Sequence, residues 1–579
     1  MKQSATMTSY FITIPISTTS PIAMETDHHQ SASAEQVSST RRTYLGALSG
    51  LLATGSVTGA TASAKGEQVE TESDRGGPWQ GISVSDSGTT VAEDLSHLDV
   101  GTSLAATALE DGNGVRIDFD SDDSNPNVVN VQSDLGLEPG EDDLWGEIYE
   151  HYQSFRPTRR RYLYVVPPGT WLVETNDIRL EGHEFFGIAG TPQSTLKVND
   201  QDVDRMMTVG TIDSSLPHAQ RTVMKDLEVD IRGDFDCGIG RWYTYSYGLI
   251  ERVSMRGARN RLHPDYGGDR HTIMVDGVLP GTTNIIKQCH LNNWDIAHDS
   301  PQVGHAIAFG SEANNRGLNI WEGCQVTGYT DNGFYVSSNS GRNILLGCTA
   351  INCAGAAFRI GANDVMRNCN LFMRQQPAHP WTGLWIENGS GQHVHNFYVR
   401  NEVRKPSEII RCTQDGQAVL ANSRIDDRGT DGRIIRVNDN DNSLTIFDGL
   451  RIDDQSAPSI SDYGVYVQSS NVRFRDCMFD FASQSDSDRN GIFVNGRGND
   501  VDSLYLDGCE VSADVASLRF ADSGEKHNVL HTTFHEMVMS DSGVDLDQVL
   551  WIGNRHEGRT RFNGQRLNWQ GDFNWEFEV

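Results

Sequence analysis

Short runs of alternating apolar and polar residues cover most of the chain from about residue 130 onward. Alternation with a period of two is typical of β-strands that turn one face toward a core. Six of these runs align on a cysteine and share, with few exceptions, the order apolar, polar, turn former, Cys, polar, apolar. They are residues 286–291, 321–326, 345–350, 366–371, 474–479 and 506–511. Cys324 and Cys348 are 24 residues apart, and Cys348 and Cys369 are 21 apart. A period of this length predicts stacked structural repeats.

A second pattern lies between the cysteine runs, where a glycine opens a short strand at 333–336, 383–386, 464–467 and 491–494. We expect these glycines to mark bends, where a positive φ costs glycine little. One repeat cannot bury its inward side chains alone, but repeats stacked about 4.8 Å apart pair every strand and align like side chains. The frame therefore predicts that Cys348 and Cys369 are buried thiols in successive turns of the solenoid.

The segment before the repeats has its own order of elements. Residues 65–129 are interpreted as a linker and a small β unit, because short alternating runs such as 115–119 occur there. Leu144, Ile148 and Tyr152 then fall on one helical face, and a strand with Pro167-Pro168-Gly169-Thr170 follows. This order resembles the N-terminal cap and first turn of the pectate-lyase-like superfamily of single-stranded parallel β-helices.

The resemblance implies an all-β fold, a right-handed parallel β-helix (solenoid) over residues 130–560. A helical cap would close the N-terminal end of its core, and residues 561–579 would form a C-terminal tail or cap. A β-propeller is the alternative, but its repeat would be near 40 residues.

The N-terminus carries the pattern of an export signal. Arg41 and Arg42 precede a weakly apolar run at 44–53, and Ala62-Ser63-Ala64 supplies a small-residue cleavage pattern. Residues 1–64 thus resemble a twin-arginine signal region, which predicts a secreted protein. The nine cysteines are an odd number and are interpreted as buried thiols rather than as a disulfide framework. No stretch reaches the roughly 20 apolar residues of a membrane span.

The charge balance favours some partners over others. The chain has 79 acidic and 47 basic residues and a formal net charge of −32, and only seven of the basic residues are lysines. Such a surface is typical of halophilic archaea, where concentrated salt screens its self-repulsion. A nucleic-acid partner is disfavoured, because phosphate binding needs a basic face.

Two segments carry candidate chemistry for the polysaccharide substrate that the resemblance implies. Tyr243, Tyr245 and Tyr247 would share one face of a strand and could stack on sugar rings. The loop 256–271 concentrates cations, with Arg259, Arg261, Arg270 and His271, and Lys287 follows it. β-Elimination of a uronate polymer needs a cation at the carboxylate, a base for the C5 proton and an acid for the leaving oxygen. The alternatives are an aromatic cluster between loops and an arginine–carboxylate network.

Three other interpretations stay open. Stacked aspartates, as in Asp426-Asp427 and Asp453-Asp454, could serve a glycoside hydrolase, although no Gly-His-Gly motif accompanies them. Calcium is a possible cofactor, with Asp426, Asp427 and Asp431 or residues 438–442 as oxygen ligands. The chain could also be a non-catalytic surface, adhesion or polysaccharide-binding module, because a fold does not fix a function.

Overall fold

The structure is a computed structural model that describes residues 126–556 with short gaps. The gaps are 156–159, 192, 214–217, 233–235, 258, 260–270, 294–305, 338–339, 378–379, 405, 431, 439–442, 457–462, 469–470, 482–488, 496–502, 522–526 and 542–548. Outside this range, only the backbone of a few strands is described. The chain divides into residues 1–80 and Gly81–Val579. The first unit, with the predicted twin-arginine signal, lies outside the described residues.

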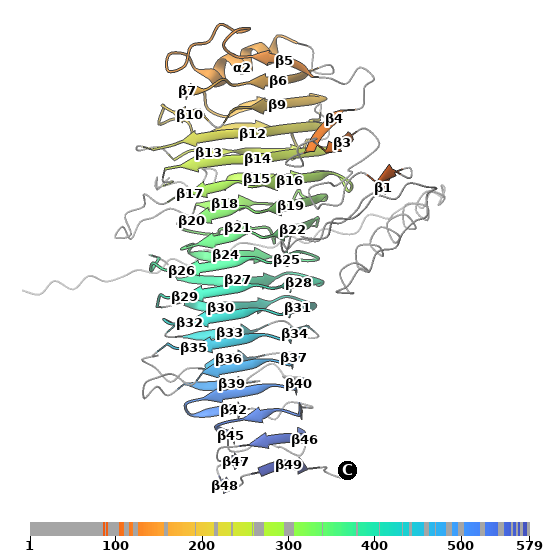
Figure 1. Cartoon of the computed structure of the whole chain (residues 1–579), viewed down its shortest axis with the longest axis vertical. Helices are drawn as coiled ribbons and strands as arrows, with labels where there is room; N and C mark the ends of the chain where they lie inside the picture. Colours follow the sequence, from red (N-terminus) through yellow and green to blue (C-terminus); the bar gives the residue numbers. More distant parts are fainter. Residues whose placement is uncertain are drawn as a thin grey trace, which may run out of the picture. The chain divides into compact units, whose positions relative to one another are not determined.

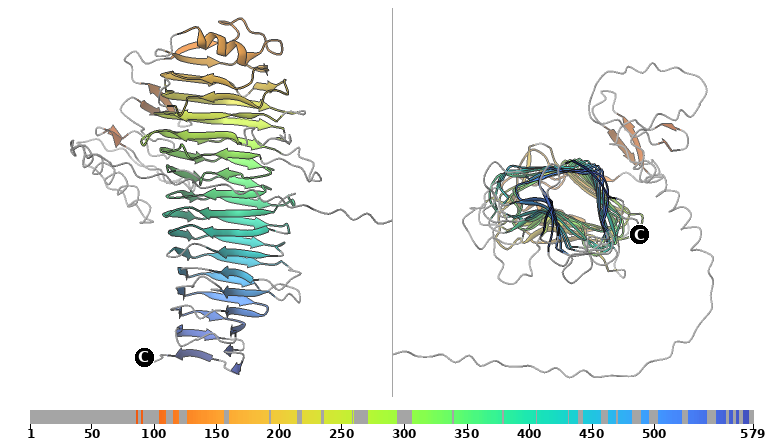
Figure 2. Two further views of the ribbon diagram at one scale, coloured as in Figure 1. Left: turned by 180° about the vertical axis from the view of Figure 1, so that it is seen from behind. Right: turned by 90° about the horizontal axis from the view of Figure 1, so that it is seen from below.

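Successive strands of the second unit stack in parallel into a right-handed β-helix, as predicted (Figure 1). Seen along the axis, the strands enclose the core (Figure 2). Three walls can be distinguished. The first and second walls are the two halves of a 29-stranded sheet that bends at a corner, and the third wall is a 16-stranded sheet.

The first wall contains, from each turn of the solenoid, the first strand that belongs to the 29-stranded sheet. Its strands are β5 (Asn127–Asn130), β6 (Arg161–Val165), β9 (Phe185–Ala189), β16 (Thr283–Lys287), β19 (Leu318–Glu322), β22 (Arg342–Leu346), β25 (Val365–Arg367), β28 (Gln392–His395), β31 (Gln417–Ala421), β34 (Leu444–Asp448), β37 (Asn471–Arg475), β40 (Ser503–Asp507) and β43 (His527–Leu530).

The second wall begins after the corner. Its strands are β7 (Gly169–Val173), β10 (Ser194–Val198), β17 (His290–Asn292), β20 (Gln325–Thr327), β23 (Thr349–Ile351), β26 (Asn370–Met373), β29 (Tyr398–Asn401), β32 (Arg424–Asp427), β35 (Arg451–Asp454), β38 (Met478–Phe481), β41 (Glu510–Ala513) and β44 (Thr533–Phe534). Three longer strands pair with both walls: β12 (Arg221–Asp230), β14 (Tyr247–Arg256) and β46 (Val549–His556).

The third wall completes each turn. Its strands are β8 (Ile178–Leu180), β11 (Arg205–Val209), β13 (Gly238–Thr244), β15 (His271–Gly277), β18 (Ile307–Gly310), β21 (Phe334–Tyr335), β24 (Gly355–Ile360), β27 (Trp381–Glu387), β30 (Pro406–Thr413), β33 (Arg433–Val437), β36 (Tyr463–Val467), β39 (Asn490–Val494), β42 (Ala516–Phe520), β45 (Met537–Ser540), β47 (Thr560–Phe562) and β48 (Gln565–Leu567).

The corner between the first and second walls explains the cysteine frame. The turn former before each framed cysteine has a positive φ, for example 58° at Gly323, 61° at Gly347 and 54° at Asn368. Glycine and asparagine tolerate this left-handed conformation better than other residues. The cysteine after the turn points inward and is buried. A small side chain suits this position, because the corner is tight.

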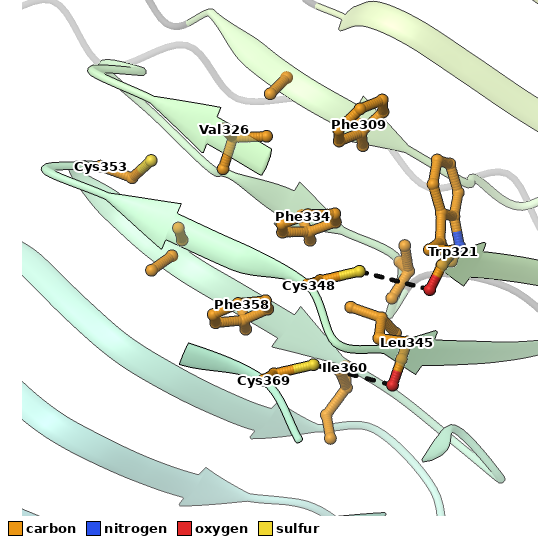
Figure 3. Packing of buried hydrophobic residues seen from close by; sticks show 14 of the residues in the cluster. Phe309, Trp321, Val326, Phe334, Leu345, Cys348, Cys353, Phe358, Ile360 and Cys369 are labelled. Atoms are coloured by element: carbon orange, nitrogen blue, oxygen red, sulfur yellow. Dashed lines mark hydrogen bonds between the residues drawn. The ribbon is translucent and has the colours of Figure 1, made fainter. Parts of the chain in front are cut away.

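The framed thiols form an internal ladder. Cys348 and Cys369 are fully buried, as predicted, and the amide of Asn370 donates to the carbonyl oxygen of Cys348. The thiol of Cys348 donates to the carbonyl oxygen of Trp321 at 3.3 Å, and that of Cys369 to the carbonyl oxygen of Leu345 at 3.7 Å (Figure 3). All nine cysteines are buried and free, which confirms their interpretation as small buried side chains.

The glycines of the second pattern have a different role from the predicted one. Gly333, Gly383, Gly464 and Gly491 are not among the residues with positive φ. A Cβ atom on Gly333 would lie 2.6 Å from the carbonyl oxygen of Ala357, and one on Gly491 would lie 2.4 Å from that of Ser517. Close approach to a neighbouring turn, rather than backbone conformation, therefore requires glycine at these two positions.

Each end of the solenoid is closed differently. Helix α2 (Leu144–Gln153) buries Leu144, Trp145, Ile148 and Tyr152 and packs against β7 and β8, which confirms the predicted helical cap. At the other end β49 (Gly571–Trp575) pairs antiparallel with β46, and β48 pairs antiparallel with β47. Before the solenoid, β1 (Ser85–Asp86) pairs with β2 (Thr89–Thr90) and β3 (Leu104–Ala108) with β4 (Val115–Phe119), both antiparallel.

Candidate functional site

Of the four candidate site residues in the loop 256–271, Arg259 and His271 are described, and both are buried. Arg259 is 3% exposed, and its guanidinium contacts the Asp236 carboxylate at 2.9 Å. Its backbone N–H donates to the side-chain oxygen of Asn293 at 2.6 Å. His271 is also 3% exposed and opens β15. Arg261 and Arg270 lie outside the described residues. Arg259 therefore forms part of the alternative interpretation, an arginine–carboxylate network.

The other predicted site residues do not lie on one surface. Strand β13 ends at Thr244 on the third wall, and β14 begins at Tyr247 on the first wall. Tyr243 therefore belongs to the third wall, whereas Tyr247 is 5% exposed in an apolar cluster of the first wall. Tyr245 lies between these strands and stacks on His218 with ring centroids 3.7 Å apart. The expectation that the three rings share one face is wrong, because the chain bends between the strands.

Lys287 lies on the first wall, where its ammonium nitrogen is 3.1 Å from the Glu251 carboxylate. It is the register partner of Glu251 and Glu322, so these three residues lie in one column along the first wall. A single groove formed by Lys287 and Tyr243 does not result, because these residues belong to different sheets.

The acidic pairs divide between the two faces of the second wall. Asp426 and Asp453 are register partners with partly exposed side chains, and Asp480 is the next partner. Asp426 accepts a hydrogen bond from Tyr398 at 2.8 Å and contacts Arg424 at 2.6 Å.

The adjacent aspartates point inward. Asp427 and Asp454 are buried, and Asp454 pairs with the fully buried Arg489 at 2.8 Å. In the described part of the chain, no group of three or more His, Cys, Asp or Glu side chains could hold a metal ion. Asp431 and most of residues 438–442 lie outside it, so calcium binding stays a prediction.

The outer face of the third wall carries a column of arginines and aromatic residues that the sequence analysis did not single out. Each member is the register partner of the next, one turn further along the solenoid. We call this the arginine–aromatic column; its members are Tyr335, Arg359, Trp385, Arg411, Arg436, Tyr466, Phe493 and Arg519. At about 4.8 Å between strands, the column extends for roughly 34 Å.

The first four members of the column form a stack of alternating rings and cations. The Arg359 guanidinium carbon lies 4.6 Å from the ring centroid of Tyr335 and 4.2 Å from that of Trp385. That of Arg411 lies 4.4 Å from the Trp385 centroid, and the indole N–H donates to the Thr413 hydroxyl at 2.8 Å. These distances are typical of cation–π contacts, which fix the side chains in place.

Buried carboxylates neutralise two of these arginines. Glu387 is 6% exposed and accepts from Arg359 at 2.6 and 2.9 Å, one bond on each of its oxygens. Glu408 is 4% exposed and accepts from Arg436 at 3.3 Å. Arg411 has no ion pair with any described residue, and its Nε atom is buried without a hydrogen-bond partner. A half-buried cation without a counter-charge is costly for a protein to maintain.

Titratable groups gather at the end of the column nearest the N-terminus. The His271 ring is parallel to that of Tyr335 at 6.3 Å, and it fits there because Gly310 has no side chain: a Cβ atom would lie 2.1 Å from the His271 Cδ2. The Nε2 of His271 is 3.5 Å from the Glu312 carboxylate. Asp276 is buried beside them, and burial raises its pKa to about 7.

Hydrogen bonds explain how Asp276 is held. One of its oxygens accepts from the backbone N–H of Glu312 at 2.8 Å and from the Ser311 hydroxyl at 3.4 Å. The other oxygen is buried without a hydrogen-bond partner among the described residues. Tyr243 is its register partner, and burial also raises the pKa of that phenol. The raised pKa values show a desolvated cluster, which is a common property of functional sites.

The sequence did contain a signal for the column. In all four glycine runs the second residue after the glycine is aromatic, namely Tyr335, Trp385, Tyr466 and Phe493. Arginine occupies the equivalent register position in the turns between or after them. The glycine spacing alone does not predict the column, because its arginines occupy the same outward position in turns that lack the glycine run.

Several solved structures resemble this chain at low identity. The tailspike protein of E. coli bacteriophage HK620, in complex with a hexasaccharide, matches with a TM-score of 0.41 and 10% identity, over 79% of this chain and 82% of that protein. Tailspike protein 3 of bacteriophage CBA120 matches with a TM-score of 0.31 and 11% identity, over 78% of this chain but only 62% of that one. The periplasmic alginate epimerase AlgG matches with a TM-score of 0.29 and 11% identity, over 77% and 84%.

No protein-family model and no curated protein matches the sequence. The strand order and register define the class, a right-handed parallel β-helix protein. Because the TM-scores are low, the function must be argued from the residues of this chain. The described residues include no helix with the length and hydropathy needed to cross a membrane.

Proposed function

We propose that the outer face of the third wall binds an anionic polysaccharide along the arginine–aromatic column. The observation that carries the proposal is the half-buried guanidinium of Arg411, which stacks on Trp385 and has no carboxylate partner. In a chain with a net charge of −32, an arginine that lacks a carboxylate partner at such a position is not explained by general composition. A carboxylate or sulfate group of a ligand would supply the missing counter-charge.

The shape of the column suits a polymer better than a small ligand. Its members repeat once per turn, so a chain lying along the axis would meet a cation or a ring at regular intervals. Rings offer apolar area and guanidinium groups offer planar donors, the two features with which proteins hold acidic sugars. Several weak contacts on one polymer add up to a high apparent affinity.

Calorimetric titration in molar salt tests this proposal. We expect polygalacturonate to bind and an uncharged galactan to bind at least about tenfold more weakly, because an ionic hydrogen bond contributes about 1.5–3 kcal/mol. The variant Arg411→Gln, which keeps length and polarity but loses the charge, should weaken polygalacturonate binding by a similar factor. Equal affinity for the charged and uncharged polymers would refute the proposal.

A second candidate function is cleavage of the bound polymer, favoured by the cluster at the end of the column. His271 lies beside Tyr335 and contacts Glu312, so these two groups can accept or donate a proton there. Tyr243 is the register partner of Asp276, and Arg241 is a cation in the register column of Tyr335. In β-elimination, one of these groups would remove the C5 proton, the C4–O bond would break as the C4–C5 double bond forms, and a second group would protonate the leaving oxygen. Arg241 would neutralise the uronate carboxylate. The catalytic roles predicted for Lys287 and Arg259 are weaker, because both are held in ion pairs elsewhere.

The ultraviolet absorbance of the unsaturated product distinguishes binding from cleavage. A lyase should produce it from polygalacturonate, and His271→Ala should reduce the rate by about a hundredfold, the low end for loss of an acid or base. If the wild type binds the polymer without producing this absorbance, the chain is a binding module. An increase in reducing ends alone would indicate hydrolysis.

A further inference from the structure

The first wall carries a second group of cations, separate from the arginine–aromatic column. Arg342 begins β22, Arg367 ends β25, and His393 and His395 lie on β28. Arg367 and His395 are register partners, and Val365 and His393 are the partners two residues earlier. Between them, Met366 and Val394 point inward and are fully buried. By the two-residue period of a strand, the four basic side chains therefore lie on the outer face.

These four groups are close enough to repel one another. The rings of His393 and His395 are nearly parallel, at 7°, with centroids 6.4 Å apart. Burial and the positive charges of Arg342 and Arg367 lower the pKa of His393. Burial, Arg367 and His393 lower the pKa of His395, and Asp448 opposes this effect. Like charges held together at a surface are unfavourable unless a ligand separates them or neutralises them.

The arginines lack counter-charges. Neither Arg342 nor Arg367 has an ion pair with a described residue, and the Nε atom of each is buried without a hydrogen-bond partner. The nearest inward carboxylate, Asp364, is already used: it accepts from the backbone and side chain of Asn343 and from the backbone of Gly361. Burial lowers the pKa of both guanidinium groups, which is the sign of cations that are poorly solvated.

We propose that Arg342, Arg367, His393 and His395 form a binding site for a doubly charged oxyanion, of the sulfate or phosphate class. Two guanidinium groups offer planar donors to such an anion, and two imidazole rings can add a donor and a charge each when protonated. The site does not depend on the function proposed for the third wall, since it lies on another sheet.

The histidines make the affinity depend on pH. Burial and the neighbouring cations lower the pKa of both rings in the free protein, which favours their neutral forms. A bound dianion favours the protonated rings, and by linkage the affinity must rise as pH falls through their pKa range. Asp448 and Asp364 are the acidic groups that act on this cluster, but Asp364 is fully buried and Asp448 acts on His395 alone.

Titration of the full chain with sodium sulfate at constant ionic strength tests the proposal, because sulfate keeps its double charge throughout. We expect sulfate affinity to rise between about pH 8 and about pH 5 and the NMR-measured pKa values of His393 and His395 to rise on binding, by about one unit for each tenfold gain in affinity. Arg367→Gln should weaken sulfate binding about tenfold or more.

A matched control and a second variant keep the test decisive. Arg475→Gln removes an arginine from the same outward column, but Arg475 lies in register with Asp448 and Asp507, so sulfate affinity should not change. His393 is exposed, so His393→Gln should leave the core folded while it abolishes the larger part of the pH dependence of sulfate affinity. Absence of sulfate-dependent shifts in both histidines, or equal losses from Arg367→Gln and Arg475→Gln, would overturn the site.

One further titration distinguishes two sources of the bound oxyanion, a sulfated polymer and the free ion. If dextran sulfate binds about tenfold or more tightly per sulfate than inorganic sulfate, and Arg367→Gln removes this gain, the anion belongs to a sulfated polymer. If inorganic sulfate or phosphate binds equally well, the site takes the free ion. Both results support the oxyanion site and differ only in the source of the ion.

Discussion

The guanidinium group of Arg359 lies over the ring of Trp385, with its carbon 4.2 Å from the ring centroid. The two residues are register partners in neighbouring turns of the third wall. Arg359 also donates two hydrogen bonds to the buried Glu387, so the indole ring and the carboxylate together fix its orientation. This contact shows how a parallel β-helix holds an outward guanidinium group: the register aligns it with a ring, and a buried carboxylate binds it.

Replacing Trp385 with alanine should weaken binding of an acidic polysaccharide about tenfold, equivalent to about 1.4 kcal/mol. The variant removes the ring between Arg359 and Arg411 but leaves the pair of Arg359 with Glu387. Tyr398→Ala is a matched control, because Tyr398 is an outward aromatic residue of the second wall. Calorimetry should show no change in this control, and a loss as large as that of Trp385→Ala would argue against the column.

The variant Asp276→Asn should reveal the raised pKa of Asp276 as a pH-dependent gain in stability. In the folded state the carboxyl holds its proton until about pH 7, whereas in the unfolded state it loses it near 3.8. The favourable contribution of the protonated group is complete below about 3.8 and is lost as pH rises through 7. At pH 8 the asparagine variant should therefore be the more stable protein, by roughly 4 kcal/mol at most.

Denaturant unfolding of both proteins at several pH values measures this difference. The gain in free energy of unfolding should shrink as pH falls toward 4. Because all other titratable groups are shared, subtraction of the two curves isolates Asp276. A difference that is constant with pH would show that the carboxyl is ionised normally.

Cys369→Asp should destabilise the solenoid by more than about 4 kcal/mol, because it places an unpaired charge in a corner where the thiol is fully buried. Cys369→Ala is the steric control and should cost about 1 kcal/mol. Thermal unfolding compares the three proteins. In the native wild type, Cys348 and Cys369 should react slowly with a thiol reagent, and rapid labelling of both would contradict the internal ladder.

Removal of salt should unfold or loosen the protein. The formal charge of −32 repels itself when the screening length grows from about 3 Å in molar salt to about 10 Å at 0.1 M. Far-UV circular dichroism should then show a loss of β signal and a lower melting temperature. A melting temperature that stays the same across this range would remove the basis for the halophilic interpretation.

The sequence predicted the fold better than the site. The cysteine frame recurs in four consecutive turns and later in two more. It depends on two local constraints, a left-handed corner residue and a small buried side chain, and both are visible in the residue types. The walls on which Lys287 and Tyr243 lie depend instead on the number of residues in each corner. Because the bend after Thr244 separates two sheets, residues only four apart, such as Tyr243 and Tyr247, belong to different walls.

The arginine–aromatic column could be predicted from the sequence only in part. Its aromatic members follow the glycine runs, so the outward positions of Tyr335 and Trp385 could be read from the sequence once the third wall was recognised. The ion pairs of the column could not be predicted from the sequence. Glu387 and Glu408 are two of 79 acidic residues, and only the structure shows that they contact Arg359 and Arg436.

The most direct test of the proposed polysaccharide-binding face compares two double variants that change the net charge equally. Arg359→Gln with Arg411→Gln alters the third wall, and Arg424→Gln with Arg451→Gln alters two register partners on the second wall. Calorimetric titration with polygalacturonate in molar salt should show at least about a hundredfold loss of affinity for the first double variant, since two ionic contacts are lost, and no more than a twofold loss for the second. Equal losses in the two proteins would show that binding follows net charge and would contradict a binding site on the third wall.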